Sequence, residues 1–412
     1  MKPVPVMSFH SVGDHGLPGE MRHLTTSPEV LEGCLRWLQR RKFTAVTQQQ
    51  LFDHLAHGAD IADRAILLAF DDGYLDNWVW VHPLLQKYGM RGVIYVTGEF
   101  IEPGDQPRPI ALGKVARTDL PGLGYCNPAE LRSVAQAESL ELGSHLMTHS
   151  WQPNSGEILE FHRPAEPCAW MAWNAAGDEK PNWLSWQSSD YGRILPWGSP
   201  VYANTRSHAA PAVTPDPAVV EALRARVIAE GESSGDPSAP ADSFFARPDW
   251  REELYAAARA AGCEERDGRL HAPVIARESR EEFEARFEAE CREARALLED
   301  ISGQPCPFMA WPGGVYDARL QELALRHYEA TFTTDPGVQA AGDDPRLIKR
   351  SFFAQRSPEL MGKAWPSVLH FAGRTRRLRG QGWARIQTGI ANRVLKRAAQ
   401  RKGSAGPQEG YS

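Results

Sequence analysis

The stretch Ala65-Ile66-Leu67-Leu68-Ala69-Phe70-Asp71-Asp72-Gly73 contains six apolar residues in succession, followed by two carboxylates and a glycine. A continuous apolar run of this length is typical of a strand that is buried on both faces. Asp71 and Asp72 therefore stand at the end of a strand, where parallel α/β folds form their active sites. The glycine permits a turn that lets both carboxylates reach one cavity. The alternative is a solvated turn, because Asp and Gly are favoured turn residues.

Short apolar runs alternate with helical patterns on both sides of this strand, which predicts a parallel α/β sheet or barrel. Strands are expected at residues 4–9, 65–70, 92–97, 140–144, 307–311, 330–334 and 347–353. Helices are expected to begin at Ser27-Pro28, at Thr47 and at Asn127-Pro128. Ser279 and Glu282 form a capping box that starts a further, long helix ending near Gly303.

The alternation of strands and helices stops between residues 151 and 278, so this segment is interpreted as an insertion. It would separate a first part of the barrel, 1–150, from the remainder, 279–373. Six of the thirteen tryptophans lie in its first part, between Trp151 and Trp197, namely Trp151, Trp170, Trp173, Trp183, Trp186 and Trp197. Indole rings stack on the apolar faces of sugars, and they also fill the core of irregular segments. We expect most of them in the core and one or two along a carbohydrate cleft.

His145 and His149 have the spacing that places two histidines on one face of a helical turn, where both can bind one metal ion. A pair of capping or core histidines is the alternative. The pair follows the expected strand 140–144, so it falls at the same edge of the sheet as Asp71-Asp72. One carboxylate and two imidazoles leave positions open for water and substrate. Such a set suits Zn²⁺, and also Fe²⁺, Co²⁺ or Ni²⁺.

The order of these motifs resembles that of the NodB-like polysaccharide deacetylases, carbohydrate esterase family 4. The segment 70–74 resembles the first motif of that family, 144–149 the second, and Trp311-Pro312-Gly313-Gly314 the Pro-x-Gly of the third. The resemblance implies a distorted (β/α)7-type barrel with the Trp-rich insertion over its mouth. It also implies that Asp71 is the general base and that Asp72, His145 and His149 bind one divalent metal ion, with Zn²⁺ expected.

Two departures from the family pattern concern the partners of Asp71. The family often has an arginine just before the Pro-x-Gly, where this chain has residues 309–311, Met-Ala-Trp; Arg350 is a substitute. The C-terminal histidine motif has only a poor match at 368–370. Instead, the segment 7–11 resembles the N-terminal segment of the poly-N-acetylglucosamine de-N-acetylases, a permuted branch in which this early histidine is the acid. His10 is therefore expected to be the general acid.

The resemblance assigns further roles at the same site. The backbone N–H of Gly313 stabilises the oxyanion, and Trp311 and Arg350 contribute to the substrate site. The expected activity is de-N-acetylation of an N-acetylated sugar in a surface polysaccharide or a lipid-linked precursor, with release of acetate. The alternatives are a hydrolase of the same superfamily that acts on a small non-sugar amide or imide, and a catalytically silent carbohydrate-binding protein. Metal content and assays with cyclic amides would separate them.

Composition and charge restrict the partners and the compartment. The net charge of −6 makes nucleic acid an unexpected partner. The six cysteines form no CxxC pair, and the N-terminus has no apolar signal region, so a reduced, cytoplasmic location is expected. No stretch approaches the ~20 apolar residues of a membrane span.

The C-terminal segment 374–412 is a basic tail. Ten Lys or Arg and no acidic residue lie between Arg374 and Lys402, which leaves −16 on the rest of the chain. Trp383, Ile386, Ile390 and Val394 follow one another at helical spacing within it. Such a basic amphipathic helix is typical of an element that binds an anionic membrane surface peripherally, here the inner face. A solvated helix on the protein body or a disordered end is the alternative.

Overall fold

The computed structural model of this chain describes residues 2–112, 115–234, 240–353 and 364–401. It divides into two compact units, Met1–Met147 with Cys291–Ser412, and Thr148–Glu290. All six cysteines are free. Among the described residues, no helix has both the length and the apolar character of a membrane span.

A mostly parallel sheet forms the first unit. Its strands are β1 (Val6–Phe9), β4 (Thr44–Ala45), β5 (Ala65–Asp72), β6 (Gly92–Val96), β7 (Leu140–Ser144), β14 (Phe308–Ala310), β15 (Ala330–Phe332), β16 (Leu347–Ile348) and β17 (Ser351–Phe352). They are hydrogen-bonded in the order β16-β15-β14-β7-β6-β5-β1-β17, with β4 on β5. A short parallel pair, β2 (Ser11–Val12) and β3 (Thr25–Thr26), lies apart.

The ends of this strand order meet, which closes the sheet into a barrel. β16 pairs with β15 and β17 pairs with β1, but only Lys349 and Arg350 separate β16 from β17 in the chain. Two residues span at most ~7 Å, so β16 and β17 act as one interrupted strand between β15 and β1. With β5, β6, β7 and β14 this makes seven parallel strand positions. The expected distorted (β/α)7-type barrel is confirmed, and its distortion lies at Lys349-Arg350.

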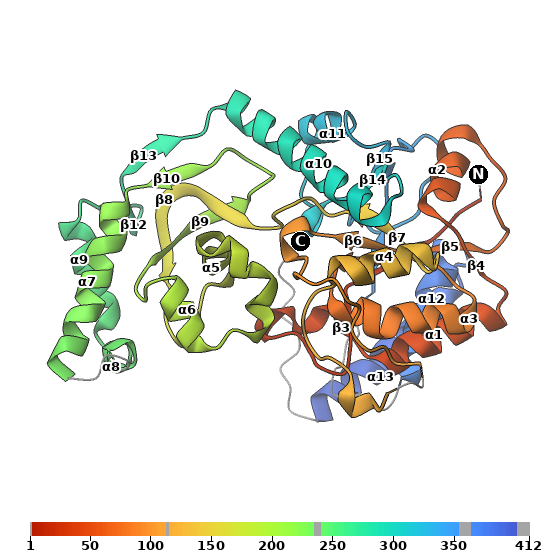
Figure 1. Cartoon of the computed structure of the whole chain (residues 1–412), viewed down its shortest axis with the longest axis horizontal. Coiled ribbons are helices and arrows are strands. Elements are labelled where there is room, and N and C mark those ends of the chain that lie inside the picture. The colour runs from red at the N-terminus through yellow and green to blue at the C-terminus, as the bar shows by residue number, and fades with distance from the viewer. Residues whose placement is uncertain (1, 113–114, 235–239, 354–363, 402–412) are drawn as a thin grey trace. The chain divides into compact units, whose positions relative to one another are not determined.

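Helices join the strands of the barrel. They are α1 (Pro28–Arg40), α2 (Gln48–His57), α3 (His82–Tyr88), α4 (Pro128–Gln136), α10 (Arg280–Ser302), which is shared with the second unit, α11 (Ala318–Ala324), α12 (Trp365–Leu378) and α13 (Ala384–Arg401). Shorter turns are η1 (Gly19–Leu24), η2 (Asn77–Val81), η3 (Gly98–Phe100), η4 (Arg117–Asp119) and η6 (Pro312–Gly314). Figure 1 shows α1, α2, α3 and α4 around β5, β6 and β7.

Strand β5 is buried on both faces, as its apolar run predicted. Ile66, Leu68 and Phe70 pack into one core cluster, and Leu67 and Ala69 pack into another. Alternation of side chains along the strand separates the two sets. Both faces are covered by apolar side chains, and the polar residues of β5, Asp71 and Asp72, stand at its C-terminal end.

The second unit has its own antiparallel sheet, in the order β11-β12-β8-β9. Its elements are β8 (Trp151–Phe161), α5 (Ala169–Ala175), η5 (Gly177–Ser185), α6 (Ser188–Ile194), β9 (Pro200–Arg206), β10 (Val213–Pro215), α7 (Pro217–Ser234), α8 (Pro240–Ala246), α9 (Trp250–Ala260), β11 (Glu264–Arg266), β12 (Arg269–His271) and β13 (Val274–Arg277). A separate core forms around Phe161, Leu223 and Phe244. Trp173 and Trp183 are buried at 2% and 4% exposure, so these two indoles serve the core.

Candidate metal and catalytic site

The two carboxylates at the end of β5 differ in backbone conformation. Both side chains are buried, at 3% exposure for Asp71 and 6% for Asp72. Asp71 continues the extended strand, but Asp72 has φ of 75° and Gly73 has φ of 83°. Consecutive residues of a strand point to opposite faces, and the left-handed conformation of Asp72 is the local feature that breaks this alternation. A left-handed backbone costs energy for a residue other than glycine, so the surrounding structure must hold Asp72 in it.

His145 is oriented by a hydrogen bond from its ring to the backbone. Its Nδ1 lies 2.8 Å from the carbonyl oxygen of Ala310, at the end of β14. A carbonyl oxygen only accepts, so Nδ1 carries the proton and Nε2 carries the lone pair. Nε2 lies 3.4 Å from Oδ1 of Asp72. Buried metal-binding histidines are oriented in this way, with the second ring nitrogen donating to a carbonyl or carboxylate.

His149 is brought to the site by a bent loop, which corrects the expectation of a helical turn. β7 ends at Ser144, and the backbone of Leu146 and His149 has φ of 60° and 43°. Two left-handed residues within this segment are incompatible with a helix. Thr148 is held by Glu290, whose carboxylate accepts from its backbone N–H at 2.9 Å and from its hydroxyl at 2.8 Å. These bonds fix the loop that carries His149.

Asp72, His145 and His149 offer ligand atoms that all lie within 4.8 Å of one another. One carboxylate and two imidazoles match the ligand types and open coordination of a catalytic divalent-metal site. The tautomer of His145 also favours metal binding, since Nε2 is the ring nitrogen whose lone pair can bind an ion. The three ligands expected from the sequence are thus together and fit a metal ion.

Asp71 is held by Arg350, as the sequence predicted. Nη1 of Arg350 donates to Oδ1 of Asp71 at 2.6 Å, and its Nε donates to the carbonyl of Thr333 at 2.9 Å. Arg350 is only 1% exposed. A buried arginine fixes the carboxylate in position and supplies the opposite charge that a buried anion needs. The other oxygen, Oδ2, faces His10.

His10 lies at the edge of the same site. Its Nε2 is 3.8 Å from Oδ2 of Asp71. Burial lowers its pKa, and the opposing effect of Asp72 and Asp71 is smaller. The side chain of Asn77 donates to the carbonyl of His10 at 3.1 Å, which holds this backbone in place.

A second buried carboxylate near His10 was not expected from the sequence. Asp76 accepts from the hydroxyl of Ser11 at 2.6 Å and from the amide of Asn77 at 2.8 Å. Burial raises its pKa to about 6, against the effect of these hydrogen bonds. Asp76 and Asn77 therefore tie β2 and the end of β1 to η2, directly after the Asp-Asp-Gly turn. Their position immediately after Asp71-Asp72 was the signal that could have identified them.

The turn η6 follows β14 beside His145. Gly313 and Gly314 have φ of 61° and 74°, and a Cβ at Gly314 would lie 1.9 Å from Oγ1 of Thr334. The glycine pair is therefore required by the turn itself. Trp311, expected to contact substrate, is instead fully buried, and its indole N–H donates to Thr331 at 3.1 Å. This packing corrects that expectation, because a side chain in the core has no surface to offer a sugar.

Tyr74 follows the Asp-Asp-Gly turn and contacts the side chain of Asp72. Its side chain hydrogen-bonds the carboxylate, and its pKa is raised well above the ordinary value, mainly by burial. The phenol therefore stays protonated and donates. Its ring stacks on Tyr125 with centroids 5.1 Å apart.

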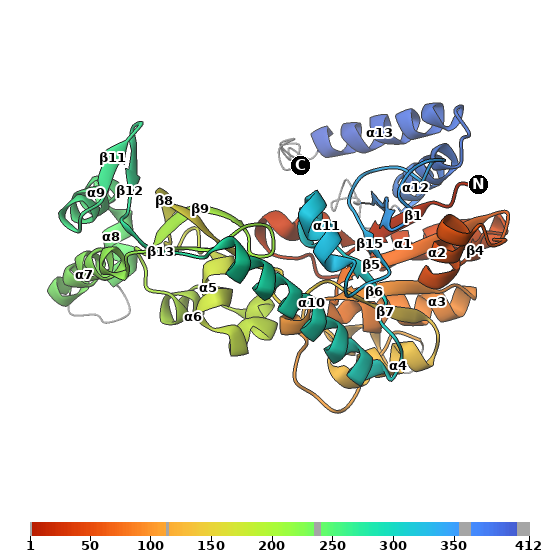
Figure 2. The same cartoon turned by 90° about the horizontal axis from the view of Figure 1, so that it is seen from above.

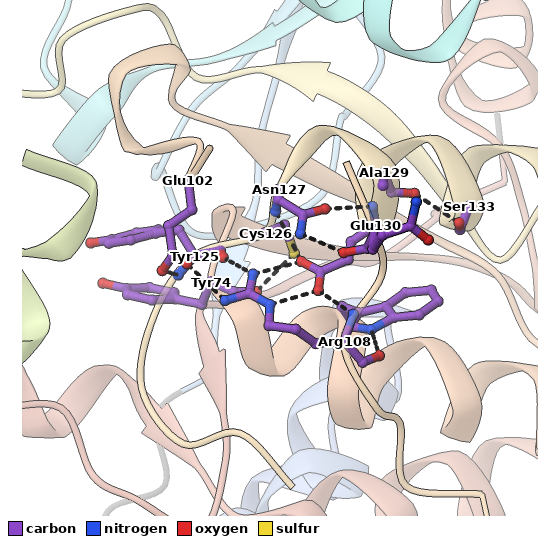
Figure 3. Close-up of polar contacts among 11 residues, drawn as sticks. Tyr74, Glu102, Arg108, Tyr125, Cys126, Asn127, Ala129, Glu130 and Ser133 are labelled. Atoms are coloured by element: carbon purple, nitrogen blue, oxygen red, sulfur yellow. Dashed lines mark hydrogen bonds and ion pairs between the residues drawn. The ribbon is translucent and has the colours of Figure 1, made fainter. Parts of the chain in front are cut away.

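An arginine cluster holds the segment that carries Tyr125 (Figure 3). The guanidinium of Arg108 donates twice to Glu130, at 2.7 Å each, once to Glu102, also at 2.7 Å, and once to the carbonyl of Tyr125 at 2.5 Å. Glu130 is fully buried, so its charge depends on this bidentate pair. Asn127 caps the helix that carries Glu130, since its side chain accepts from the backbone N–H of that residue. The cluster thus stabilises the loop packed against Tyr74.

Arg206 is a neighbour of His149 that the sequence did not suggest. Its Nη1 lies 3.4 Å from Nδ1 of His149, and its guanidinium stacks 3.6 Å from the ring centroid of Trp151. His370, the other acid candidate, lies apart: it is buried in α12 with its ring 6.0 Å from that of Phe353.

Comparison with known proteins agrees with the motifs. Residues 59–195 match the family model described as polysaccharide deacetylase. A Bacillus subtilis (strain 168) protein, YxkH, is 26% identical over 98 residues, which are 24% of this chain and 33% of that protein. The poly-beta-1,6-N-acetyl-D-glucosamine N-deacetylase of Escherichia coli (strain K12) is 24% identical over 151 residues, 36% of this chain and 21% of that protein. The chain thus matches about a fifth to a third of the length of these relatives.

Among solved structures, a de-N-acetylase from Aggregatibacter actinomycetemcomitans aligns with a TM-score of 0.47 and 17% identity, covering 84% of this chain and 94% of that chain. The BpsB deacetylase domain from Bordetella bronchiseptica aligns with a TM-score of 0.46 and 17% identity, covering 85% and 95%. The matched family segment contains both the Asp-Asp-Gly and the His-x-x-x-His motifs, and the resemblance inferred from them is confirmed.

Proposed function

We propose that this chain, which carries a polysaccharide deacetylase domain over residues 59–195, is a metal-dependent hydrolase that removes the acetyl group from an N-acetylated sugar. The substrate is a surface polysaccharide or its lipid-linked precursor. The observation that carries the proposal is the grouping of Asp72, His145 and His149 as ligands beside an Asp71 that is held by Arg350. The poly-N-acetylglucosamine deacetylase among the relatives supports the substrate class.

Each group of residues at the site has its own role in the proposed reaction. Asp72, His145 and His149 would hold the metal, with Zn²⁺ proposed, and the bound ion would polarise the acetyl carbonyl and lower the pKa of water. Oδ1 of Asp71 is engaged by Arg350, so Oδ2 is the oxygen that takes the proton of the attacking water. The backbone N–H of Gly313 stabilises the oxyanion. His10 protonates the departing amine, and acetate and a free amino sugar leave.

Arg350 also bears on the alternative of a catalytically silent sugar-binding protein. The absence of an arginine among the three residues before Pro312 favours that alternative. Because Arg350 reaches Asp71 from the break between β16 and β17, the general base keeps a cationic partner. A reduced compartment, with the enzyme at the cytoplasmic face of the membrane, is part of the proposal.

The direct test is acetate release by the full chain loaded with Zn²⁺. The substrates are oligomers of N-acetylglucosamine, their O-acetylated analogues and small cyclic amides. The proposal expects acetate from the N-acetylated oligomers. The control is Asp71→Asn, which keeps the metal ligands but loses on the order of 10²–10⁴-fold in turnover, since an amide cannot accept the proton. Hydrolysis of cyclic amides alone, or glycan binding without acetate release, would refute it.

A further inference from the structure

A surface cleft of about 500 Å³ in the first unit is lined by unpaired cations. Arg40, Arg41, Lys42 and Arg64 line it together with a single acidic residue, Asp63. That carboxylate already pairs with Nζ of Lys2 at 2.8 Å. Within the described ranges, none of the four cations forms an ion pair. The cleft therefore has a local excess of positive charge on a chain whose net charge is negative.

Two further arginines lie near this cleft, Arg376 on α12 and Arg379 directly after that helix. The side chain of Arg379 donates to the carbonyl of Asp63. The guanidinium of Arg376 lies 5.3 Å from the ring centroid of Trp37 and 5.2 Å from that of Trp383. Arg376 thus links Trp37 of α1 to Trp383, at the start of α13, through cation–π contacts.

The pKa values of these two arginines reflect the same local excess of positive charge. The pKa of Arg376 is lowered by burial and then by the charge of Arg41. The pKa of Arg379 is lowered by burial and then by Arg64, with Asp63 opposing. A guanidinium whose pKa is lowered by a neighbouring cation lies close to that cation, with too few anions between them.

Helix α13 presents one face to the protein and leaves an apolar face exposed. Ala384, Thr388, Ala391 and Leu395 are buried, and α12 and α13 run side by side (Figure 2). The residues that were expected to form an apolar stripe point elsewhere: Trp383, Ile386 and Ile390 are 58%, 69% and 48% exposed.

A basic row follows the exposed stripe along the same helix. Its members, Arg385, Arg393, Lys396 and Arg397, are all exposed. At 3.6 residues per turn, the row lies beside the apolar stripe, on the side away from the buried face. No Asp or Glu occurs between residues 374 and 402.

We propose that α13 and the adjoining basic cleft dock on the surface of a bilayer that contains anionic lipids. The stripe of Trp383, Ile386 and Ile390 enters the interface between headgroups and acyl chains, and the cations bind lipid phosphates at headgroup depth. Charge complementarity identifies this occupant. A second copy of the chain would oppose cations to cations, and a nucleic acid offers no apolar layer for the stripe. This surface is separate from the residues of the proposed catalytic site.

The test is co-flotation of the full chain with vesicles of phosphatidylcholine alone and of phosphatidylcholine with phosphatidylglycerol. Binding is expected only with the anionic lipid and should weaken as NaCl is raised, because salt screens surface charge. Two double variants separate the contribution of the apolar stripe to vesicle binding from that of the basic cleft. Ile386→Ser with Ile390→Ser, and Arg40→Gln with Lys42→Gln, should each lower the partition coefficient by roughly tenfold or more.

The matched control is Ile275→Ser with Arg277→Gln, an exposed apolar and an exposed basic residue on β13 of the other unit. This variant should float like the parent protein. All the substituted side chains are exposed, so the variants should keep the circular dichroism and melting of the parent. Equal binding by parent and both test variants would overturn the proposal. So would a concentration-dependent dimer in the ultracentrifuge that Ile386→Ser with Ile390→Ser abolishes, without vesicle binding by the parent.

Discussion

Arg350 and Asp71 form a buried ion pair although they are 279 positions apart in the sequence, with Nη1 donating to Oδ1 at 2.6 Å. Their side chains are 1% and 4% exposed. The pair exists because the barrel closes where Lys349-Arg350 interrupts its last strand, which directs the arginine to the end of β5. A buried carboxylate without such a partner would be destabilised.

Substitution of Arg350 should therefore damage both folding and activity. Arg350→Gln leaves the charge of Asp71 buried and unpaired, and we expect the free energy of unfolding to fall by about 3–5 kcal/mol. Denaturant unfolding measures it, and the double variant with Asp71→Asn completes a mutant cycle. The double variant should regain part of the loss, since no lone charge remains. Additive effects in this cycle would show that the two side chains do not interact.

His149→Ala should lose the bound metal. Two protein ligands hold a divalent ion much more weakly than three, and metal affinity depends on the complete set. Elemental analysis of the purified protein after dialysis against Zn²⁺ measures the occupancy. His57→Ala, at an exposed position on α2, is the control and should keep the metal of the parent. Full occupancy in His149→Ala would remove this histidine from the ligand set.

His10→Ala should lower turnover on an N-acetylated sugar more than turnover on an aryl acetate ester. An amine is a poor leaving group unless it is protonated, whereas a phenolate departs without help. Metal content should not change, because His10 is outside the ligand group. His370 is a buried residue of α12, and His370→Gln should change turnover on the amide and on the ester by the same factor. An equal loss for amide and ester in His10→Ala would indicate a structural histidine.

His162 should make the second unit less stable as the pH falls. Its Nδ1 accepts from the backbone N–H of Cys168 at 2.8 Å, the side chain is fully buried, and burial lowers its pKa to about 4. The imidazole of the unfolded chain has a pKa near 6.5. Between that pH and about 4, it binds a proton that the folded protein does not bind. Stability is therefore complete above pH ~6.5 and falls toward pH ~4, by up to about 1.4 kcal/mol per unit.

The comparison for this prediction is His162→Gln, whose amide oxygen can still accept from Cys168 but does not titrate. Urea unfolding at several pH values between about 4 and 7 gives the slope for each protein. The parent should lose more stability over this range than the variant. Parallel slopes would mean that His162 does not contribute.

The sequence by itself determined the elements and the chemistry of the motifs. The apolar run 65–70 is a strand buried on both faces, and Ser279 and Glu282 form the capping box that starts α10. These features depend on neighbouring residues and on the period of side chains along a strand or helix, so local patterns identify them. The same holds for Asp71-Asp72, because the end of a parallel strand is also the edge of the site.

Only the tertiary structure decided how those groups face one another. The left-handed backbone of Asp72, the bent loop that carries His149 and the burial of Trp311 are imposed by packing and cannot be read from local preference. The ion pair of Arg350 with Asp71 needs the closed barrel, in which β16 and β17 bring the first and last strands together. Contacts across hundreds of residues are set by closure of the whole sheet, whereas a strand or a cap is set by its immediate neighbours.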